Sequence, residues 1–278
     1  MTETATYSEE STSRSVTVDG LEIHYHEAGT GAPLVLLHGG GPGDGGWASY
    51  GQNVPGLARH FRVLLPDLPQ FGRSTPAVID EPRGVYYARI VRGFLDALGI
   101  DKAHVAGHSM GAGAALKLAV DSPDSLDRLV AIAPHIGVPS TFMPMPSEGI
   151  KRLNEVFANA TVDTLREMMK VLVHDASFAT DAFLAERVPV IRNEAILEAR
   201  RKSFAGMYDL TPELAKIQAR TLLVWGREDR FIPLDFGLTL LARIPEAHLY
   251  VFPRCGHWVQ HDAGAGFERL LTDWLSAP

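Results

Sequence analysis

The chain has 278 residues, of which 46% are hydrophobic and 21% are charged, and its formal net charge is −7. The negative charge argues against nucleic acid as a partner, and no run approaches the 18 apolar residues of a transmembrane helix. The single cysteine, Cys255, excludes an internal disulfide and fits a reducing cytoplasm, where we expect the protein to act.

The first elements are a polar arm and a hairpin. The first thirteen residues contain no apolar segment of the kind found in secretory signals, so we do not expect them to be one. We expect a mobile or partner-packed arm there. Ser15–Val18 and Glu22–His26 alternate in polarity on either side of Asp19-Gly20, which predicts a β-hairpin. His24 and His26 share one face of the second strand. Because no third metal ligand is nearby, we expect that face to be solvated.

A glycine-rich loop follows the next strand. Leu34–Leu37 is a short apolar run typical of a buried strand, and it leads into the loop His38-Gly39-Gly40-Gly41-Pro42-Gly43. Such a loop lets backbone N–H groups approach a reacting group without obstruction by side chains. Because these donors stabilise an oxyanion, we assign one of them to Gly40. The alternatives are a flexible glycine turn or a phosphate-binding loop, but the Lys-Ser/Thr pair that a phosphate-binding loop requires is missing.

Strands and helices then alternate along the chain. Arg62–Leu65 and Leu126–Ala133 have the pattern of strands, and Val85–Leu98 has that of an amphipathic helix. This alternation is typical of a parallel sheet covered on both faces by helices. Ligands of such sheets bind at the carboxyl ends of the strands. We therefore expect an α/β protein with a mostly parallel, eight-stranded sheet.

A serine between two glycines lies at the next strand end. Gly107-His108-Ser109-Met110-Gly111 follows the apolar run Ala103–Ala106 and precedes the helical pattern Ala112–Val120. Strand, sharp turn and helix form the context of a nucleophile elbow, in which the serine hydroxyl is exposed at the turn. Ser109 is therefore the candidate nucleophile, and the backbone N–H of Met110 is the second candidate oxyanion donor.

The strand pattern stops between residues 136 and 210. Four segments there predict helices, at residues 147–158, 162–173, 181–191 and 194–205. We divide the chain into a core of residues 1–135 and 211–278 and a helical cap of residues 136–210, inserted after the sixth strand. Apolar cap residues either line a site or only join the cap to the core: Phe142, Met143, Met145, Phe157, Met168 and Met169.

Two further strand ends carry an acid and a histidine. Thr221–Trp225 precedes Asp229, which we prefer to Glu228 as the orienting carboxylate, and Leu249–Phe252 precedes His257. In a Ser-His-Asp triad, the histidine takes the serine proton and the acid holds its tautomer. Ser109, Asp229 and His257 follow in the chain order of an α/β-hydrolase. Cys255 is interpreted as a small residue that fills space beside His257.

Several of these segments resemble one family, the meta-cleavage product hydrolases. The resemblance covers nearly the whole chain, is weakest in the cap, and is carried by these segments: residues 10–14 and 24–29, the triple-glycine loop with Gly46-Trp47, residues 225–235, and residues 255–258. It implies hydrolysis of 2-hydroxy-6-oxo-dienoates from aromatic or steroid degradation. The dienol would become a ketone before the C5–C6 bond is cleaved. No cofactor or metal is implied, and the family often forms dimers.

The resemblance also implies substrate contacts. Arg187 matches the family's carboxylate-binding arginine, since a guanidinium pairs bidentately with a carboxylate; the alternative is a surface arginine paired with Glu186 or Asp181. Further implied contacts are Gly39, Gly41, Ser49, His108, Phe231, Ile232 and Trp258. Three positions depart from the family pattern: His108 and Ser49, where the family often carries Asn, and Gln70, where it carries Gly.

Two other functions fit parts of the sequence. A carboxylic-ester hydrolase would use the same triad, and His108 before the nucleophile is common in esterases. A ligand-binding module on a hydrolase scaffold is disfavoured, because it would gain nothing from three intact triad residues. The sequence does not identify the substituent on C6 of the dienoate.

Overall fold

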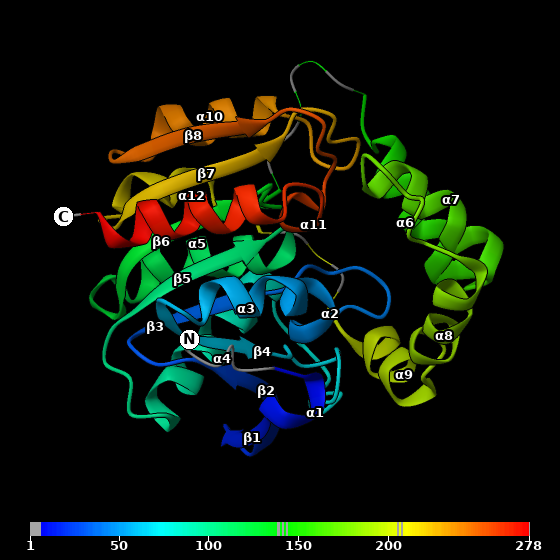
Figure 1. The fold of residues 1–278 in the computed structure, drawn as a ribbon, viewed down its shortest axis with the longest axis horizontal. Helices are drawn as coiled ribbons and strands as arrows, with labels where there is room; N and C mark the ends of the chain where they lie inside the picture. The colour runs from blue at the N-terminus through cyan, green and yellow to red at the C-terminus, as the bar shows by residue number, and fades with distance from the viewer. Residues whose placement is uncertain are drawn as a thin grey trace, which may run out of the picture.

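The computed structural model describes residues 7–137, 140, 142, 144–204, 206 and 208–277. Its centre is one eight-stranded sheet with the strand order β1-β2-β4-β3-β5-β6-β7-β8 (Figure 1). The strands are β1 (Ser13–Val18), β2 (Leu21–Ala28), β3 (Ala32–Leu37), β4 (Phe61–Pro66), β5 (Ala103–His108), β6 (Leu126–Ile132), β7 (Arg220–Gly226) and β8 (Ala247–Phe252). The β1–β2 and β2–β4 pairs are antiparallel, and the other pairs are parallel.

Helices cover both faces of the sheet. They are α1 (Glu9–Thr12), α2 (Gly46–Tyr50), α3 (Val54–Leu57), α4 (Arg83–Ala97), α5 (Met110–Asp121), α6 (Glu148–Ala158), α7 (Val162–Leu172), α8 (Asp181–Ile191), α9 (Glu194–Lys202), α10 (Asp235–Arg243), α11 (Val259–Asp262) and α12 (Ala265–Ser276), with 3₁₀ turns at Gly51–Asn53, Pro123–Ser125 and Thr211–Lys216. Buried side chains of α4, α5 and α10 form one core, and those of α3, α11 and α12 form the other. The predicted α/β architecture, mostly parallel and eight-stranded, is confirmed.

The hairpin forms where the sequence predicts it. Asp19 and Gly20 both have positive φ, at 50° and 77°, as the two central residues of a type I′ turn require. Val18 pairs with Leu21 in the antiparallel register next to this turn. The local turn chemistry is therefore sufficient to set the register of β1 and β2.

The prediction of a solvated histidine face on β2 is wrong. His24 and His26 are 5% and 2% exposed. Nδ1 of His24 lies 2.8 Å from Oδ2 of Asp67, and Nδ1 of His26 lies 3.0 Å from the hydroxyl of Thr12. Because β2 lies between β1 and β4, and α1 contacts it, polar side chains on this strand are enclosed and need partners.

Helices α6–α9 lie between β6 and β7 in the chain and form a layer opposite the carboxyl ends of the strands (Figure 1, right). Each of the four begins at a residue whose side chain accepts a hydrogen bond from the first turn: Ser147, Thr161, Thr180 and Asn193. Such N-caps satisfy backbone donors that the helix leaves free. The helix predicted over 194–205 ends earlier, at Lys202, and Ala205 lies outside the described residues. No described helix is both long and apolar enough to span a membrane.

Candidate active site

Ser109 occupies a sharp turn between β5 and α5. Its φ and ψ are 52° and −112°, a conformation that costs energy for a residue with a side chain. The turn is held because Ser109 N–H donates to the carbonyl of Ile132 at 2.8 Å. A Cβ on Gly107 would lie 2.4 Å from the carbonyl oxygen of Gly111, and one on Gly111 would lie 2.4 Å from that of His38. Both glycines are therefore required by close backbone packing.

Asp229 and His257 are in direct contact. Nδ1 of His257 lies 2.8 Å from Oδ2 of Asp229. The other carboxylate oxygen, Oδ1, accepts the backbone N–H groups of Phe231 and Ile232 at 2.7 and 2.9 Å. Because the carboxylate only accepts, Nδ1 of His257 carries the proton and Nε2 is left with its lone pair. The neighbouring Glu228 instead accepts the backbone N–H of Cys255.

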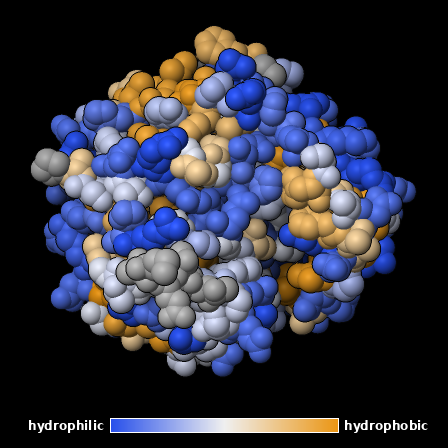
Figure 2. All heavy atoms as spheres, in the orientation of Figure 1, coloured by the Kyte–Doolittle hydropathy of each residue, from blue (hydrophilic) through white to orange (hydrophobic). Residues whose placement is uncertain are grey.

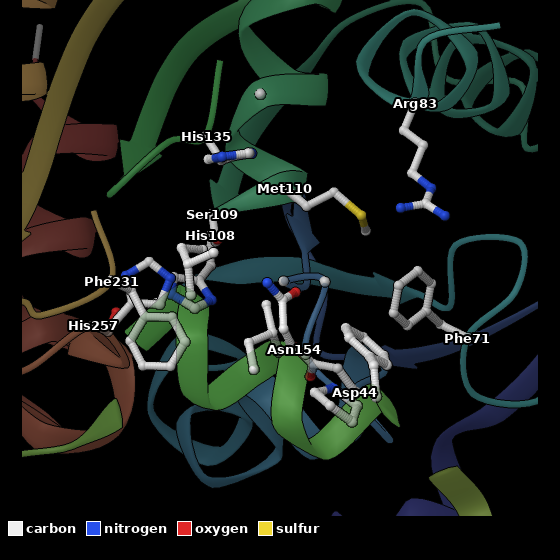
Figure 3. A pocket seen from close by; sticks show the side chains of 18 of the residues that line it. Asp44, Phe71, Arg83, His108, Ser109, Met110, His135, Asn154, Phe231 and His257 are labelled. Atoms are coloured by element: carbon white, nitrogen blue, oxygen red, sulfur yellow. The ribbon is translucent and has the colours of Figure 1, made fainter. Parts of the chain in front are cut away.

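His257 is fixed from several sides. Its backbone N–H donates to the carbonyl of Leu172 at 2.8 Å, and its ring stacks on Phe231 with centroids 4.9 Å apart and an interplanar angle of 12°. Figure 3 shows Ser109, His257 and Phe231 together at one end of a cavity. The hydroxyl, the imidazole and the carboxylate are therefore held by rigid strand ends in one region.

His108 supports His257 instead of presenting a donor to the cavity. Its Nε2 lies 2.9 Å from the carbonyl oxygen of His257, so Nε2 carries the proton and donates. Its Nδ1 is buried without a partner, beside Gly39. Burial, together with the charge of His257, holds the pKa of His108 well below its usual value. His108 is thus neutral, with its one donor committed to the backbone.

The glycine loop is set by His38. The backbone N–H of Leu68 donates to Nε2 of His38 at 2.9 Å, so Nδ1 carries the proton and donates to the carbonyl of Gly39 at 2.7 Å. A Cβ on Gly40 would lie 3.2 Å from the sulfur of Met110, so these two candidate oxyanion donors are neighbours. The N–H of Met110 belongs to the first turn of α5, where backbone donors lack helical partners.

The cavity beside Ser109 has a volume of about 920 Å³. It is lined by the candidate triad members Ser109 and His257 and by seven of the eight predicted contacts: Gly39, Gly41, His108, Arg187, Phe231, Ile232 and Trp258. Ser109 and His257 lie at one end, while Phe71 and Arg83 lie at the other (Figure 3). The predicted contacts come from both the sheet loops and helix α8, which meet only in the folded chain.

Ser49 is the exception among the predicted contacts. It does not line this cavity, and its hydroxyl instead donates to Asp44, whose carboxylate does line it. Burial raises the pKa of Asp44, although the charge of His38 and the bond from Ser49 lower it. The sequence analysis missed Asp44, because an acid in a glycine-rich loop has the same pattern as a turn residue.

Three arginines of helices α8 and α9 line the cavity: Arg187, Arg200 and Arg201. Arg187 on α8 stacks on Phe183 with 3.5 Å from its Cζ to the ring centroid, and it forms no ion pair with a described acidic residue. The alternative partner Asp181 pairs with Arg166 instead. Arg200 on α9 also lines the cavity, and the sequence analysis did not single it out. Its position in a run of basic residues at a helix end is typical of a solvated helix terminus.

The apolar cap residues divide into two groups. Phe157, Met168 and Met169 line the cavity. Phe142 and Met145 are 74% and 43% exposed and do not line it, so their assignment to an apolar lining or joint is wrong. Both lie in the connection before α6, where the backbone N–H of Phe142 donates to Asp235 of α10 while the Phe142 side chain stays exposed. Met143 lies outside the described residues.

Among the described residues, two other kinds of site would offer a second chemistry: a cysteine nucleophile at Cys255 and a metal centre. Cys255 is buried, and burial raises the pKa of its thiol to about 12, so it is not a nucleophile at neutral pH. Within the described parts of the chain, no three His, Cys, Asp or Glu side chains are grouped to hold a metal ion. The chemistry available at the cavity is therefore that of Ser109, His257 and Asp229.

Comparison with known proteins agrees with this geometry. A family model described as the alpha/beta hydrolase fold matches residues 32–264. The 2-hydroxy-6-oxo-6-phenylhexa-2,4-dienoate hydrolase of Burkholderia cepacia is 43% identical over 97% of this chain and 98% of its own length. The 2-hydroxy-6-oxononadienedioate/2-hydroxy-6-oxononatrienedioate hydrolase of Comamonas testosteroni is 41% identical over 96% and 98%.

Solved structures extend the comparison. The 2-hydroxy-6-oxo-6-phenylhexa-2,4-dienoate hydrolase from Rhodococcus sp. strain RHA1 has a TM-score of 0.85 at 27% identity and covers 95% of this chain and 98% of its own. A meta-cleavage product hydrolase from Pseudomonas fluorescens IP01 has a TM-score of 0.83 at 27% identity, with 94% and 97% covered. The chain therefore belongs to the α/β-hydrolase family and, within it, to the meta-cleavage product hydrolases, which are carbon–carbon bond hydrolases.

Proposed function

We propose that this enzyme hydrolyses the C5–C6 bond of a 2-hydroxy-6-oxo-hexa-2,4-dienoate with an apolar substituent on C6. The observation that carries the proposal is one cavity with Ser109 and His257 at one end and arginines without carboxylate partners in its wall. A dienoate has matching features, since it carries a reactive ketone at C6 and a carboxylate at C1.

Ser109, His257 and Asp229 perform the chemistry in this proposal. The lone pair of His257 Nε2 accepts a proton from Ser109, or from a water that Ser109 positions, while Asp229 stabilises the resulting imidazolium. Attack on the C6 ketone places negative charge on its oxygen, and the N–H groups of Gly40 and Met110 stabilise that charge. A carbanion is a poor leaving group, so the dienol must first become a ketone that accepts the electrons of C5, with His257 moving the protons.

Arg187 holds the carboxylate end. Its guanidinium lies in the cavity wall without an acidic partner, and burial lowers its pKa. An arginine retains its charge even so, because its unperturbed pKa exceeds 12. The charges of Asp44 and Glu186 raise the pKa of Arg187, but no described acid forms an ion pair with it, so a substrate carboxylate would supply the close counter-charge.

The surroundings of the triad support an apolar C6 substituent. Phe231 stacks on His257, and helix α7 directs Leu165, Met168, Met169 and Leu172 into the cavity. None of these side chains can pair with a second carboxylate, so an aryl or alkyl group is favoured over an acidic chain. Methionines repack easily around groups of different shape.

The test compares substrates by the bleaching of their yellow dienoate absorbance. The purified enzyme should cleave a 6-phenyl dienoate with a kcat/KM at least about 10-fold above that for a nonadienedioate, since burying one unpaired charge costs more than 1.4 kcal/mol. A p-nitrophenyl ester should be a poor substrate in parallel. Failure to bleach either dienoate, with rapid ester hydrolysis, would assign the protein to the esterases.

We also infer that the protein is a homodimer. Strand β8 is an edge of the sheet, and exposed apolar side chains lie on it and on α10: Leu238, Leu241 and Tyr250. Hydrophobic surface gathers in this part of the molecule (Figure 2, top), as expected of a contact face. Light scattering should give twice the chain mass, and Leu238→Glu with Leu241→Glu should shift it to one chain mass. A monomeric wild-type protein would contradict this.

A further inference from the structure

Arg200 enters the same cavity as Arg187 but from another helix. Its Cζ lies 4.5 Å from the ring centroid of Phe71 and 5.1 Å from that of Phe157. Because Phe71 lies at the end of the cavity away from Ser109 (Figure 3), the guanidinium of Arg200 is at that end. The two rings restrict its rotation and leave its edge available for hydrogen bonds.

The charge of Arg200 lacks a close counter-charge. Its one hydrogen bond to a described residue is a long contact of 3.4 Å to the carbonyl of Gln70. It forms no ion pair with any described acid. Burial lowers the pKa of Arg200 to about 10, so it remains charged at neutral pH. A desolvated cation without a partner is costly and commonly marks a binding site for an anion.

The carbonyl of Gln70 is presented by an unusual turn. Gln70 has a φ of 73°, a conformation that favours glycine. Its side chain donates at 2.7 Å to both the carbonyl of Ala77 and the hydroxyl of Ser203. These bonds connect the turn after β4 to the residue following α9, and so they hold the end of the helix that carries Arg200 against the core.

Arg187 and Arg200 have one acidic neighbour in common. The charge of Asp44 raises the pKa of both arginines, and all three side chains line the cavity. Among the other basic side chains of the wall, Lys117 pairs with Asp121 and Arg201 pairs with Glu194, whereas Arg83 forms no ion pair with a described acid. Arg83, Arg187 and Arg200 therefore bring three guanidinium charges to the cavity wall, against the one carboxylate of Asp44 among the described residues.

We propose that Arg200 is a second anion-binding residue, which holds the acid end of the dienoate together with Arg187. This assignment rests on the proposed function. The bound substrate carries one negative charge on its C1 carboxylate. When the C5–C6 bond breaks, its electron pair moves through the conjugated carbons to the oxygen on C2, so that end then carries two negative charges. The three guanidinium groups of Arg83, Arg187 and Arg200, together with the carboxylate of Asp44, give the cavity wall a positive charge that matches these two negative charges.

The experiment compares Arg200→Gln with Lys202→Gln in the full-length enzyme. Glutamine keeps a planar polar group between the rings but removes the charge. With a 6-phenyl dienoate, Arg200→Gln should lower kcat/KM by about 10- to 150-fold, the loss expected for a charge-assisted contact. Hydrolysis of a neutral p-nitrophenyl ester should change less than about threefold. Lys202→Gln makes the same charge change two residues later, at an exposed lysine that pairs with Glu198 and does not line the cavity, and should leave both activities within about threefold.

The outcomes separate the possible roles of Arg200. Partial recovery in Arg200→Lys would support a charge effect, because lysine restores the charge without the planar fork. Equal losses on the dienoate and the ester would overturn the assignment and make Arg200 a packing residue between its two rings. Equal losses in Arg200→Gln and Lys202→Gln that disappear at high salt would also overturn it, in favour of general steering. A wild-type enzyme that leaves the dienoate unchanged would refute the proposed function, and this assignment with it.

Discussion

Asp229→Asn tests the geometry of the candidate triad most directly. In the structure, Oδ1 of Asp229 accepts two backbone N–H groups, and Oδ2 accepts the proton on Nδ1 of His257. An asparagine would keep its oxygen toward the two backbone donors and turn its NH₂ group toward Nδ1. His257 would then carry its proton on Nε2 and could not accept one from Ser109.

The size of the effect follows from the two backbone donors. If the asparagine amide turned over, its oxygen would face Nδ1 and restore the correct tautomer of His257. The buried backbone N–H groups of Phe231 and Ile232 would then face the NH₂ group, which is also a donor. Each unsatisfied donor costs about 1–3 kcal/mol, so the competent form is disfavoured by about 2–6 kcal/mol, or roughly 30- to 10⁴-fold. We expect kcat to fall near the upper end of this range, since the same change in another triad costs about 10⁴-fold.

The assay is the single-turnover bleaching of a 6-phenyl dienoate, with thermal unfolding measured alongside. The variant should unfold within a few degrees of wild type, because the substitution preserves the volume of the side chain. Glu228→Gln is the matched control, since Glu228 is the adjacent acid and contacts the backbone of Cys255 instead of His257; its activity should stay within about threefold. An Asp229→Asn enzyme with more than a tenth of wild-type kcat would refute the reasoning.

Three further predictions concern the nucleophile, the carboxylate site and acid stability. Ser109→Ala should lower turnover of the dienoate by about 10⁴-fold or more, because triad members act as a unit; a rate above a tenth of wild type would rule Ser109 out. Arg187→Ala should lower kcat/KM for the dienoate by about 10- to 150-fold and leave a neutral ester nearly unaffected, whereas equal losses would make Arg187 a cap-folding residue. Burial lowers the pKa of His26 to about 4, so its neutral form is favoured by folding, and stability is lost as pH falls from about 6.5 toward 4. Between pH 7 and pH 5, urea unfolding should show wild type losing about 2 kcal/mol more than His26→Gln; equal losses would contradict this.

The candidate triad was recognisable in the sequence because each member lies next to a local signal. Ser109 lies between a strand pattern and a helix pattern, with glycines that the close backbone packing requires. Asp229 follows the buried strand β7, and His257 follows β8, a largely apolar edge strand. Parallel strands bring their carboxyl ends to one edge of the sheet, so the order of the segments alone placed the three residues in one region.

The predictions that failed concern which groups surround a side chain, not where the helices and strands lie. His24 and His26 alternate on β2 as a solvated face would, yet α1 and the segment after β4 enclose them. Ser49 lies beside the glycine loop, but its hydroxyl is taken by Asp44. In each case the deciding partner is a group whose position relative to the residue is not encoded by any periodic pattern.

By itself, the sequence determined the strands, the helices, the elbow and the order of the candidate triad, because hydrophobic periodicity, caps and turn residues act over a few neighbouring positions. Only the tertiary structure decided which charges face the cavity. Arg200 follows Phe71 by more than a hundred positions in the chain, yet their side chains stack. Local sequence does not specify such a contact, because it forms only when helix α9 and the turn after β4 are packed together. The same packing buries Arg200 and so lowers its pKa.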